Sequence, residues 1–159
     1  MIVVLVDIPT QRLRMIEGDK TIMDVAISSA KNGAGEAMGS ECTPRGRHIV
    51  RAKIGEGCAP NSVFISRRPS GEIYTPELDA AQPGRDWVLT RIIWLSGTEL
   101  GKNRLGNVDS MRRYIYFHGT PASEPMGVPA SHGCIRMRNE PLIELFDRVE
   151  FGTPVLING

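Results

Sequence analysis

Residues that can act together as a nucleophile and its base lie in one stretch of the sequence, residues 114–138. The stretch contains two of the three histidines, His118 and His132, together with Cys134. A thiol attacks a carbonyl only as the thiolate, so it needs a base or a positively charged neighbourhood. The fifteen residues between His118 and Cys134 are rich in Pro and Gly, and a loop of that length can fold back to bring thiol and imidazole together. The pattern predicts acyl transfer by Cys134 with His118 as its base.

The residues next to Cys134 also suit attack on an amide carbonyl. Gly133 lets the backbone approach a substrate closely. The N–H groups near Gly133 and Cys134 can form an oxyanion hole, in which each donor typically contributes about 2.7–4 kcal/mol. Arg136 lies two residues after Cys134, so in an extended chain its side chain points to the same side. A guanidinium there can bind a carboxylate through two parallel hydrogen bonds.

Short strands separated by Gly, Pro and Asx turns must position these residues. Residues 113–117 alternate polar and apolar and end at His118, so a strand is expected to hold the imidazole firmly. The runs 11–16 and 21–27 flank a Glu17-Gly18-Asp19 turn and predict a hairpin. Long or irregular loops are expected over residues 31–46, 75–86 and 97–109. The remaining expected strands cover residues 2–8, 47–53, 63–66, 89–95 and 155–157.

One helix is expected, over about residues 139–150. Asn139 can cap it, Pro141 suits its first turn, and Gly152 follows its end. Its apolar residues recur at helical spacing, at Leu142, Leu145, Phe146 and Val149. The sequence therefore predicts a mainly β domain, residues 1–159, with this helix packed on a sheet or barrel.

The composition excludes several classes of function. The chain has 159 residues and a net charge of +1, which argues against a nucleic-acid binder because such a protein needs a concentrated basic face. The pairs Arg67-Arg68 and Arg112-Arg113 are interpreted as solvated surface. No window approaches the 18 consecutive apolar residues that suggest a membrane span, and Gly33-Ala34-Gly35 lacks the strand and helix of a nucleotide site.

The cysteine count and the N-terminus bear on the compartment. Three cysteines leave at least one unpaired, so Cys42, Cys58 and Cys134 are interpreted as free thiols in a reducing compartment. A Cys42–Cys58 bridge stays open as an alternative. The first residues show no signal peptide. If Met1 is the natural start we expect a cytoplasmic protein, and if an export signal was removed, a periplasmic one.

The motif around Cys134 resembles that of a known family. His118-Gly119-Thr120 followed by Ser131-His132-Gly133-Cys134-Ile135-Arg136 is similar to the signature of the L,D-transpeptidase catalytic domain, the YkuD-like fold. The likeness extends to the opening strands, to Thr43-Pro44-Arg45-Gly46 as the family's Thr-Pro-x-Gly loop, and to the closing strand at Pro154-Val155-Leu156-Ile157. It implies a YkuD-like β-sandwich or barrel-like sheet with the one clear C-terminal helix and short helical pieces.

The resemblance also implies a substrate and a role for each residue. The family attacks the amide between the third, L-centred residue of a peptidoglycan stem tetrapeptide and the terminal D-alanine. Cys134 matches its nucleophile and His118 its base, which the carbonyl of Gly119 orients. His132 and Arg136 match its other motif residues. The expected catalytic set also includes Gly133, and the expected substrate-binding set consists of Arg136, His132, Ser131, Tyr116 and Trp94.

Three other interpretations fit the sequence less well. Zinc bound by His118, His132 and Cys134 is disfavoured because one residue separates the last two, closer than usual ligand spacings. A papain-like enzyme is disfavoured because its Cys precedes its His. A binding module that holds wall peptides without chemistry is disfavoured by the intact Cys–His pair. Trp87 and Trp94 are more typical of core than of sugar platforms, although Trp94 ends a predicted strand near the site, and His48 is expected to be structural or surface.

The acyl acceptor is the least determined point. A cytoplasmic enzyme would meet recycled stem tetrapeptides or muropeptides with water as the abundant acceptor, which favours an L,D-carboxypeptidase that releases D-alanine in peptidoglycan recycling. The alternative is an L,D-transpeptidase that forms cross-links or exchanges D-amino acids. No cofactor or metal, no nucleic acid and no membrane span are expected, and the protein is expected to be a monomer.

Overall fold

Ten strands and two α-helices make up the fold. The structure is a computed structural model that describes residues 1–159. Strand β1 is a run of β-branched and apolar residues, while β2 alternates exposed Arg12 and Arg14 with buried Leu13 and Met15. In chain order the elements are β1 (Ile2–Asp7), β2 (Arg12–Glu17), β3 (Lys20–Ala26), β4 (Gly46–Ile54), β5 (Ser62–Ile65), β6 (Arg68–Ile73), α1 (Pro76–Ala81), β7 (Leu89–Gly97), the 3₁₀ turn η1 (Gly106–Val108), β8 (Tyr116–Gly119), β9 (Ile135–Met137), α2 (Asn139–Arg148) and β10 (Pro154–Asn158).

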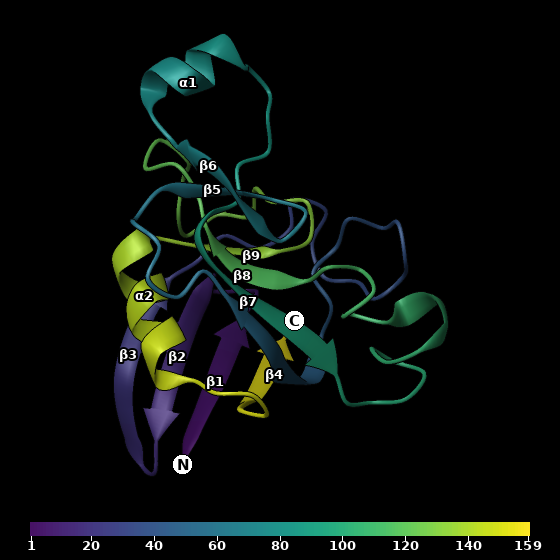
Figure 1. The fold of residues 1–159 in the computed structure, drawn as a ribbon. Coiled ribbons are helices and arrows are strands. Elements are labelled where there is room, and N and C mark those ends of the chain that lie inside the picture. The colour runs from purple at the N-terminus through teal and green to yellow at the C-terminus, as the bar shows by residue number, and fades with distance from the viewer.

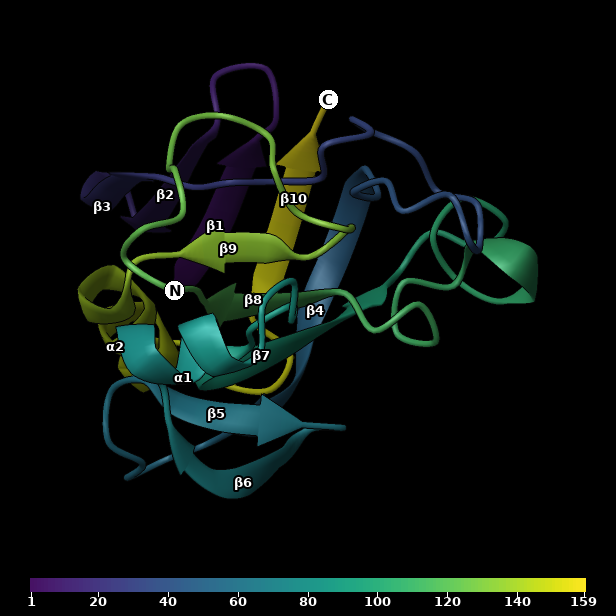
Figure 2. The same cartoon turned by 90° about the horizontal axis from the view of Figure 1, so that it is seen from above.

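All ten strands join one curled sheet. Its path runs β3-β2-β1-β10-β4-β7-β5-β6, and β8 and β9 branch from it because β8 pairs with β7 and then with β9. The pairs β1–β10 and β8–β9 are parallel, and the others are antiparallel. Figure 1 shows β5, β6 and α1 at the end of the molecule opposite the β1–β3 end. The sheet curls like a half-barrel, and Figure 2 shows β8 and β9 lying across β1, β10 and β4.

The main core lies inside the curl and is covered at one side by α2. Nineteen buried residues form it, drawn mainly from the strands between β3 and β7 on the sheet path, from β8 and β9, and from the inner face of the helix. Leu142, Leu145 and Phe146 are the fully buried residues of α2. Burying a side chain of this size stabilises the fold by about 1.5–3 kcal/mol. A Phe146→Ala change is expected to cost about 3–5 kcal/mol because it leaves a cavity.

The expected hairpin, helix and mainly β class are confirmed, with corrections at particular elements. The N-cap of α2 is Arg138, not Asn139; the Asn139 side chain instead accepts a hydrogen bond from Thr90 Oγ1 and donates one to Asn61 Oδ1. The irregular insert contains α1, which Thr75 caps by accepting a hydrogen bond from Leu78 N.

The expected strand 113–117 is shifted toward the C-terminus. It begins at Tyr116, because Tyr114 has a positive φ of 57° and breaks the extended chain, and His118 lies inside it. The strands β6 and β9 were not expected from the sequence. His48 is structural, as predicted: it is buried between Gly46 O at 3.1 Å and Ser110 Oγ at 2.7 Å.

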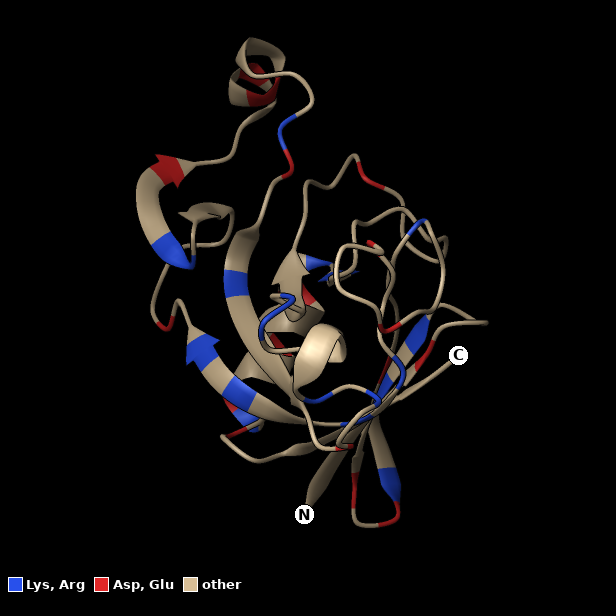
Figure 3. Ribbon diagram, turned by 90° about the vertical axis from the view of Figure 1, so that its right-hand side faces the viewer, with Lys and Arg blue, Asp and Glu red and all other residues tan.

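Three further features of the fold are its charge distribution, the length of its helices and the state of its cysteines. Figure 3 shows Lys and Arg interspersed with Asp and Glu over strands and loops. Neither α-helix combines the length and the apolar character that crossing a bilayer requires. The three cysteines are unpaired thiols.

Candidate active site

The pairing of β8 with β9 assembles the site. The two strands run parallel with His118 opposite Arg136 and Phe117 opposite Ile135. Successive side chains of a strand point to opposite faces, and Phe117 and Ile135 both belong to the main core. Tyr116 and His118 therefore face the other way, together with Arg136, and Cys134 enters the same face from the turn just before β9. All four line one cavity of about 200 Å³.

A network of short hydrogen bonds holds the turn that carries Cys134. Ser131 Oγ donates to the carbonyl of Cys134 and accepts from Gly133 N at 3.2 Å. Thr43 Oγ1 donates to Gly133 O at 2.9 Å, which ties the Thr-Pro-x-Gly loop to this turn. Gly133 has φ +131°, a conformation that favours glycine. Its N–H is used inside the turn, whereas the N–H of Cys134 has no acceptor within the protein and remains available to a substrate oxygen.

The thiol of Cys134 is held by the backbone of the segment that leads into β8. Cys134 Sγ donates to Tyr114 O at 3.1 Å and accepts from Tyr116 N at 3.4 Å. Burial raises the pKa of the thiol to about 12, although the hydrogen bond from Tyr116 N favours the thiolate. Cys134 therefore rests as a neutral thiol that donates its proton to Tyr114 O.

His118 is fixed in the tautomer that a general base requires. It is buried, and its Nδ1 lies 2.7 Å from Gly119 O. A carbonyl oxygen can only accept, so Nδ1 carries the proton and Nε2 holds the free lone pair. Burial lowers the pKa of His118, which keeps the ring neutral at neutral pH. Cys134 and His118 thus rest as a neutral pair.

Gly119 can approach its neighbours only because it lacks a side chain. A Cβ placed there would lie 2.6 Å from Leu89 O, 2.9 Å from Asn139 Oδ1 and 3.1 Å from Thr90 Oγ1. The pairing of β8 with β7 is irregular between Leu89 and Ile92, where Thr90 has φ 77°. This bulge brings β7 close to Gly119. The close packing holds the Gly119 carbonyl in the position that orients His118.

Arg136 is the cation at the bottom of the site. Only 6% of the residue is exposed, and Nη2 donates to Asp86 Oδ1 at 3.0 Å. Nη1 donates to Ala130 O at 3.3 Å and lies 3.8 Å from Glu124 Oε2. Nε is buried and has no hydrogen-bond partner. His132 is more exposed, and its Nδ1 lies 3.3 Å from the other carboxylate oxygen of Asp86.

The two aromatic residues expected to bind substrate, Tyr116 and Trp94, differ in whether they line the cavity. Tyr116 lines the cavity, and its hydroxyl accepts from Arg67 Nη1 at 3.3 Å. Trp94 does not line the cavity; it packs edge-on behind Tyr116, at 5.7 Å between ring centroids, and donates to Met111 O. Ser131 lines the cavity, but its hydroxyl serves the Cys134 turn.

Arg113 and Asp86 contribute to the site although the sequence did not single them out. Arg113 was expected on the solvated surface, but its Nη2 donates to Cys42 O at 2.6 Å and its Nη1 to Gly35 O and Glu36 O, so it fastens the long loop beside Cys134. Arg67 is partly exposed, and its guanidinium lies 4.5 Å from the centroid of the half-exposed Tyr114 ring. Both are long-range contacts that local spacing could not indicate.

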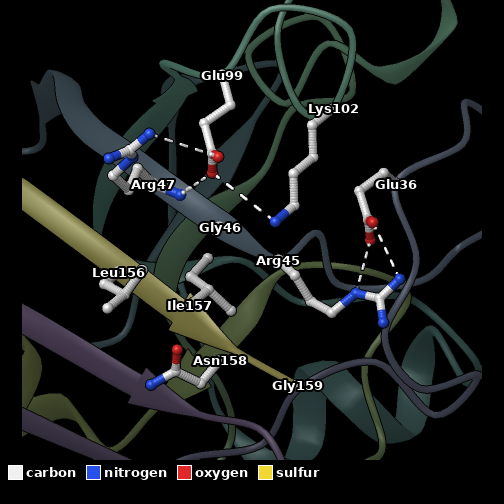
Figure 4. Close-up of a pocket in the computed structure, with 10 residues that line it drawn as sticks. All are labelled: Glu36, Arg45, Gly46, Arg47, Glu99, Lys102, Leu156, Ile157, Asn158 and Gly159. Atoms are coloured by element: carbon white, nitrogen blue, oxygen red, sulfur yellow. Dashed lines mark hydrogen bonds and ion pairs between the residues drawn. The ribbon is translucent and has the colours of Figure 1, made fainter.

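A larger cavity, about 570 Å³, lies elsewhere and lacks reactive groups. Figure 4 shows its charged side chains engaged with one another: Arg45 with Glu36, and Glu99 with Arg47 and Lys102. It contains neither Cys nor His. No group of three or more His, Cys, Asp or Glu side chains is arranged to hold a metal ion. The smaller cavity at Cys134 is the one that brings a cysteine and two histidines together.

Known proteins resemble the chain at two levels. Short segments match curated relatives: "Probable L,D-transpeptidase YbiS" of Escherichia coli (strain K12) is 46% identical over 43 residues, 27% of this chain and 14% of that protein. "Putative L,D-transpeptidase YqjB" of Bacillus subtilis (strain 168) is 48% identical over 45 residues, 28% of this chain and 26% of that protein. These matches cover well under two thirds of each relative.

Solved structures share the fold over nearly the whole chain. An L,D-transpeptidase from Mycobacterium smegmatis has a TM-score of 0.58 at 17% identity, over 99% of this chain and 58% of that one. The L,D-transpeptidase from Xylanimonas cellulosilytica has a TM-score of 0.55 at 24% identity, over 98% of this chain and 59% of that one.

The sequence pattern of one family accounts for almost all of the chain. The match to the L,D-transpeptidase catalytic domain, YkuD, runs over residues 2–157. It spans the opening strand, the turn that carries Cys134 and the closing strand β10. The chain belongs to the L,D-transpeptidase catalytic domain family.

Proposed function

We propose that the protein is a cysteine acyl-transfer enzyme that cleaves the L,D-amide of peptidoglycan stem tetrapeptides, with water as its main acceptor. One observation carries the proposal: His118 and Cys134 line the same cavity, and the carbonyl of Gly119 holds the imidazole with Nε2 unprotonated. A fixed base beside a thiol that faces a cavity is the arrangement that nucleophilic catalysis requires. Family membership supports the choice of substrate.

The arrangement suits proton transfer that is coupled to attack. The thiol is protonated at rest and donates to Tyr114 O, so the S–H first turns from this carbonyl to Nε2 of His118. Nε2 then takes the proton as sulfur bonds to the carbonyl carbon of the substrate. The free N–H of Cys134 donates to the developing oxyanion. When the C–N bond breaks, Nε2–H returns the proton to the departing amine, D-alanine, and a thioester on Cys134 remains. Water, deprotonated by Nε2, then attacks the thioester and regenerates the thiol.

Arg136 supplies recognition of the leaving residue. Arg136 is paired with His118 in the β8–β9 register and lines the same cavity. A C-terminal D-residue carries a carboxylate one residue beyond the scissile bond, and a guanidinium can bind a carboxylate bidentately. This role explains why a free C-terminal acid would be preferred over an amide.

The choice of water rests on the size of the site. The cavity at Cys134 has about 200 Å³, below the range of about 300–1,000 Å³ that is usual for small-molecule pockets. Such a volume suits one terminal residue, and after D-alanine leaves, a water molecule can enter. A second stem peptide would need more room beside the thioester.

Transpeptidation is the second candidate. The curated relatives and the solved structures carry the name L,D-transpeptidase, which favours an amine as acceptor. A second cavity of about 240 Å³ shares Asp86, His132 and Arg136 with the first and offers room for an incoming amine.

The deciding experiment incubates the purified protein with a disaccharide-tetrapeptide, with and without an added D-amino acid, and identifies the products by mass. Free tripeptide and D-alanine are expected in both reactions. Cross-linked dimers or exchanged stems without free tripeptide would contradict the carboxypeptidase assignment and support the second candidate. Absence of any product would contradict the proposed function as a whole.

A further inference from the structure

The hydrogen-bond donors of Arg136 are only partly used. Nη2 donates to Asp86 Oδ1 at 3.0 Å, and Nη1 is engaged by Ala130 O and lies near Glu124. Nε has no partner although it is buried. A buried N–H without an acceptor costs free energy, and Nε is the donor of Arg136 for which the protein itself supplies no acceptor.

Nε and Nη2 belong to one edge of the planar guanidinium. The two N–H bonds on this edge are parallel and match the two oxygens of a single carboxylate. Asp86 meets only half of this edge, because its second oxygen turns away to Nδ1 of His132, at 3.3 Å. The carboxylate is thus shared between two donors on different residues and fills neither site completely.

Asp86 is also the more exposed partner of the pair. Its side chain is 47% exposed, against 7% for Arg136. It comes from the connection between α1 and β7, whereas Arg136 is fixed in β9. Movement of the aspartate would free the edge without disturbing the strand.

We propose that Asp86 is an internal competitor that occupies the carboxylate site of Arg136 until the C-terminal carboxylate of the substrate displaces it. The inference rests on the proposed function for the identity of that carboxylate. The incoming group forms two parallel hydrogen bonds, to Nε and Nη2, where Asp86 forms one. An amidated C-terminus offers one neutral oxygen acceptor in place of two charged ones, so it displaces Asp86 less readily. Asp86 therefore weakens the binding of free-acid peptides and reduces their advantage over amides.

Competition by Asp86 predicts the direction in which its replacement changes the affinity for free-acid peptides. When a site is free for only a fraction of the time, the apparent dissociation constant is raised in inverse proportion to that fraction. Half-exposed ion pairs are weak, so Asp86→Asn is expected to tighten binding of a free-acid tetrapeptide by about two- to fivefold. Binding of the C-terminal amide should change much less. A residue that only supported Arg136 would produce the opposite sign.

The test measures dissociation constants by calorimetry in the Cys134→Ala background, so that no peptide is consumed. Free-acid and amidated stem tetrapeptides are compared in the parent, Asp86→Asn and Asp86→Ala proteins. Glu124→Gln is the matched control, since it removes the same charge beside Nη1 and leaves the Nε–Nη2 edge as it was; its effect should be smaller than that of Asp86→Asn. Weaker free-acid binding in both Asp86 variants, or equal changes for acid and amide, would overturn the inference.

A second readout does not depend on the substrate. The ¹H–¹⁵N signal of Arg136 Nε is followed while acetate is added to the same proteins. Acetate should shift this signal at lower concentration in Asp86→Asn than in the parent. If no tetrapeptide binds to any variant, the proposed function fails while the acetate titration still decides the role of Asp86. Equal acetate midpoints in the parent and in Asp86→Asn would overturn that role.

Discussion

The protonation state of Cys134 can be tested directly by its rate of alkylation as a function of pH. Burial raises the pKa of the thiol to about 12, so at pH 7 only about one molecule in 100,000 carries a thiolate. Since the thiolate is the reactive form, the rate should rise about tenfold per pH unit, or about a thousandfold between pH 7 and pH 10. A cysteine with an ordinary pKa of about 8.5 would gain only about thirtyfold and then level off.

The assay uses iodoacetamide and intact-protein mass spectrometry on a Cys42→Ser/Cys58→Ser variant, in which Cys134 is the only thiol. The same protein unfolded in guanidinium chloride is the control and should level off above about pH 8.5. If the alkylation rate of the folded protein no longer rises with pH near neutral pH, Cys134 does not rest as a neutral thiol. Such a result would mean that Cys134 and His118 rest as a thiolate–imidazolium pair.

Three further predictions concern the residues around this pair. Gly119→Ala should lower the free energy of unfolding by about 1–3 kcal/mol, because the new Cβ meets Leu89 O; unchanged stability in urea would show that the close approach is not real. Arg136→Lys should lower kcat/KM for free-acid tetrapeptides by about 10–150-fold, since a charge-assisted bond contributes about 1.5–3 kcal/mol, and equal losses on amidated peptides would argue against carboxylate binding. Burial lowers the pKa of His48 from 6.5 to about 4, so the unfolded chain binds more protons between these values. Stability present above pH 6.5 should fall by about 3 kcal/mol as the pH drops through 4. His48→Gln should flatten that slope in urea titrations at several pH values, and an unchanged slope would assign the loss to other groups.

Local sequence patterns predicted the elements whose conformation depends mainly on their own residues. The helix over Asn139–Arg148 was predicted from apolar residues that recur with the helical period. The hairpin of β2 and β3 was predicted from the Gly-containing turn between them. The motif residues His118 and Cys134 were singled out because their types and spacing are uncommon outside a catalytic site. The structure places both on one cavity.

Features that depend on distant contacts were not predictable in this way. Strand β9 has only three residues, so no pattern can reveal its parallel pairing with β8. Arg113 looked like surface because its partners, in residues 35–42, are remote in the sequence. Asp86 meets Arg136 across fifty positions, in a segment that appeared irregular. The resting thiol likewise depends on the Tyr114 carbonyl, which a positive φ turns toward Cys134.

The central claim is that Cys134 carries out covalent catalysis with His118. The most direct measurement incubates wild-type protein and Cys134→Ala with a stem tetrapeptide and follows D-alanine release, with unfolding in urea as the check that the variant is folded. Cys42→Ala serves as the matched control for loss of a thiol near the site. We expect D-alanine release by wild type and by Cys42→Ala, and none by a stably folded Cys134→Ala. A folded Cys134→Ala protein that retains most of the activity would contradict it.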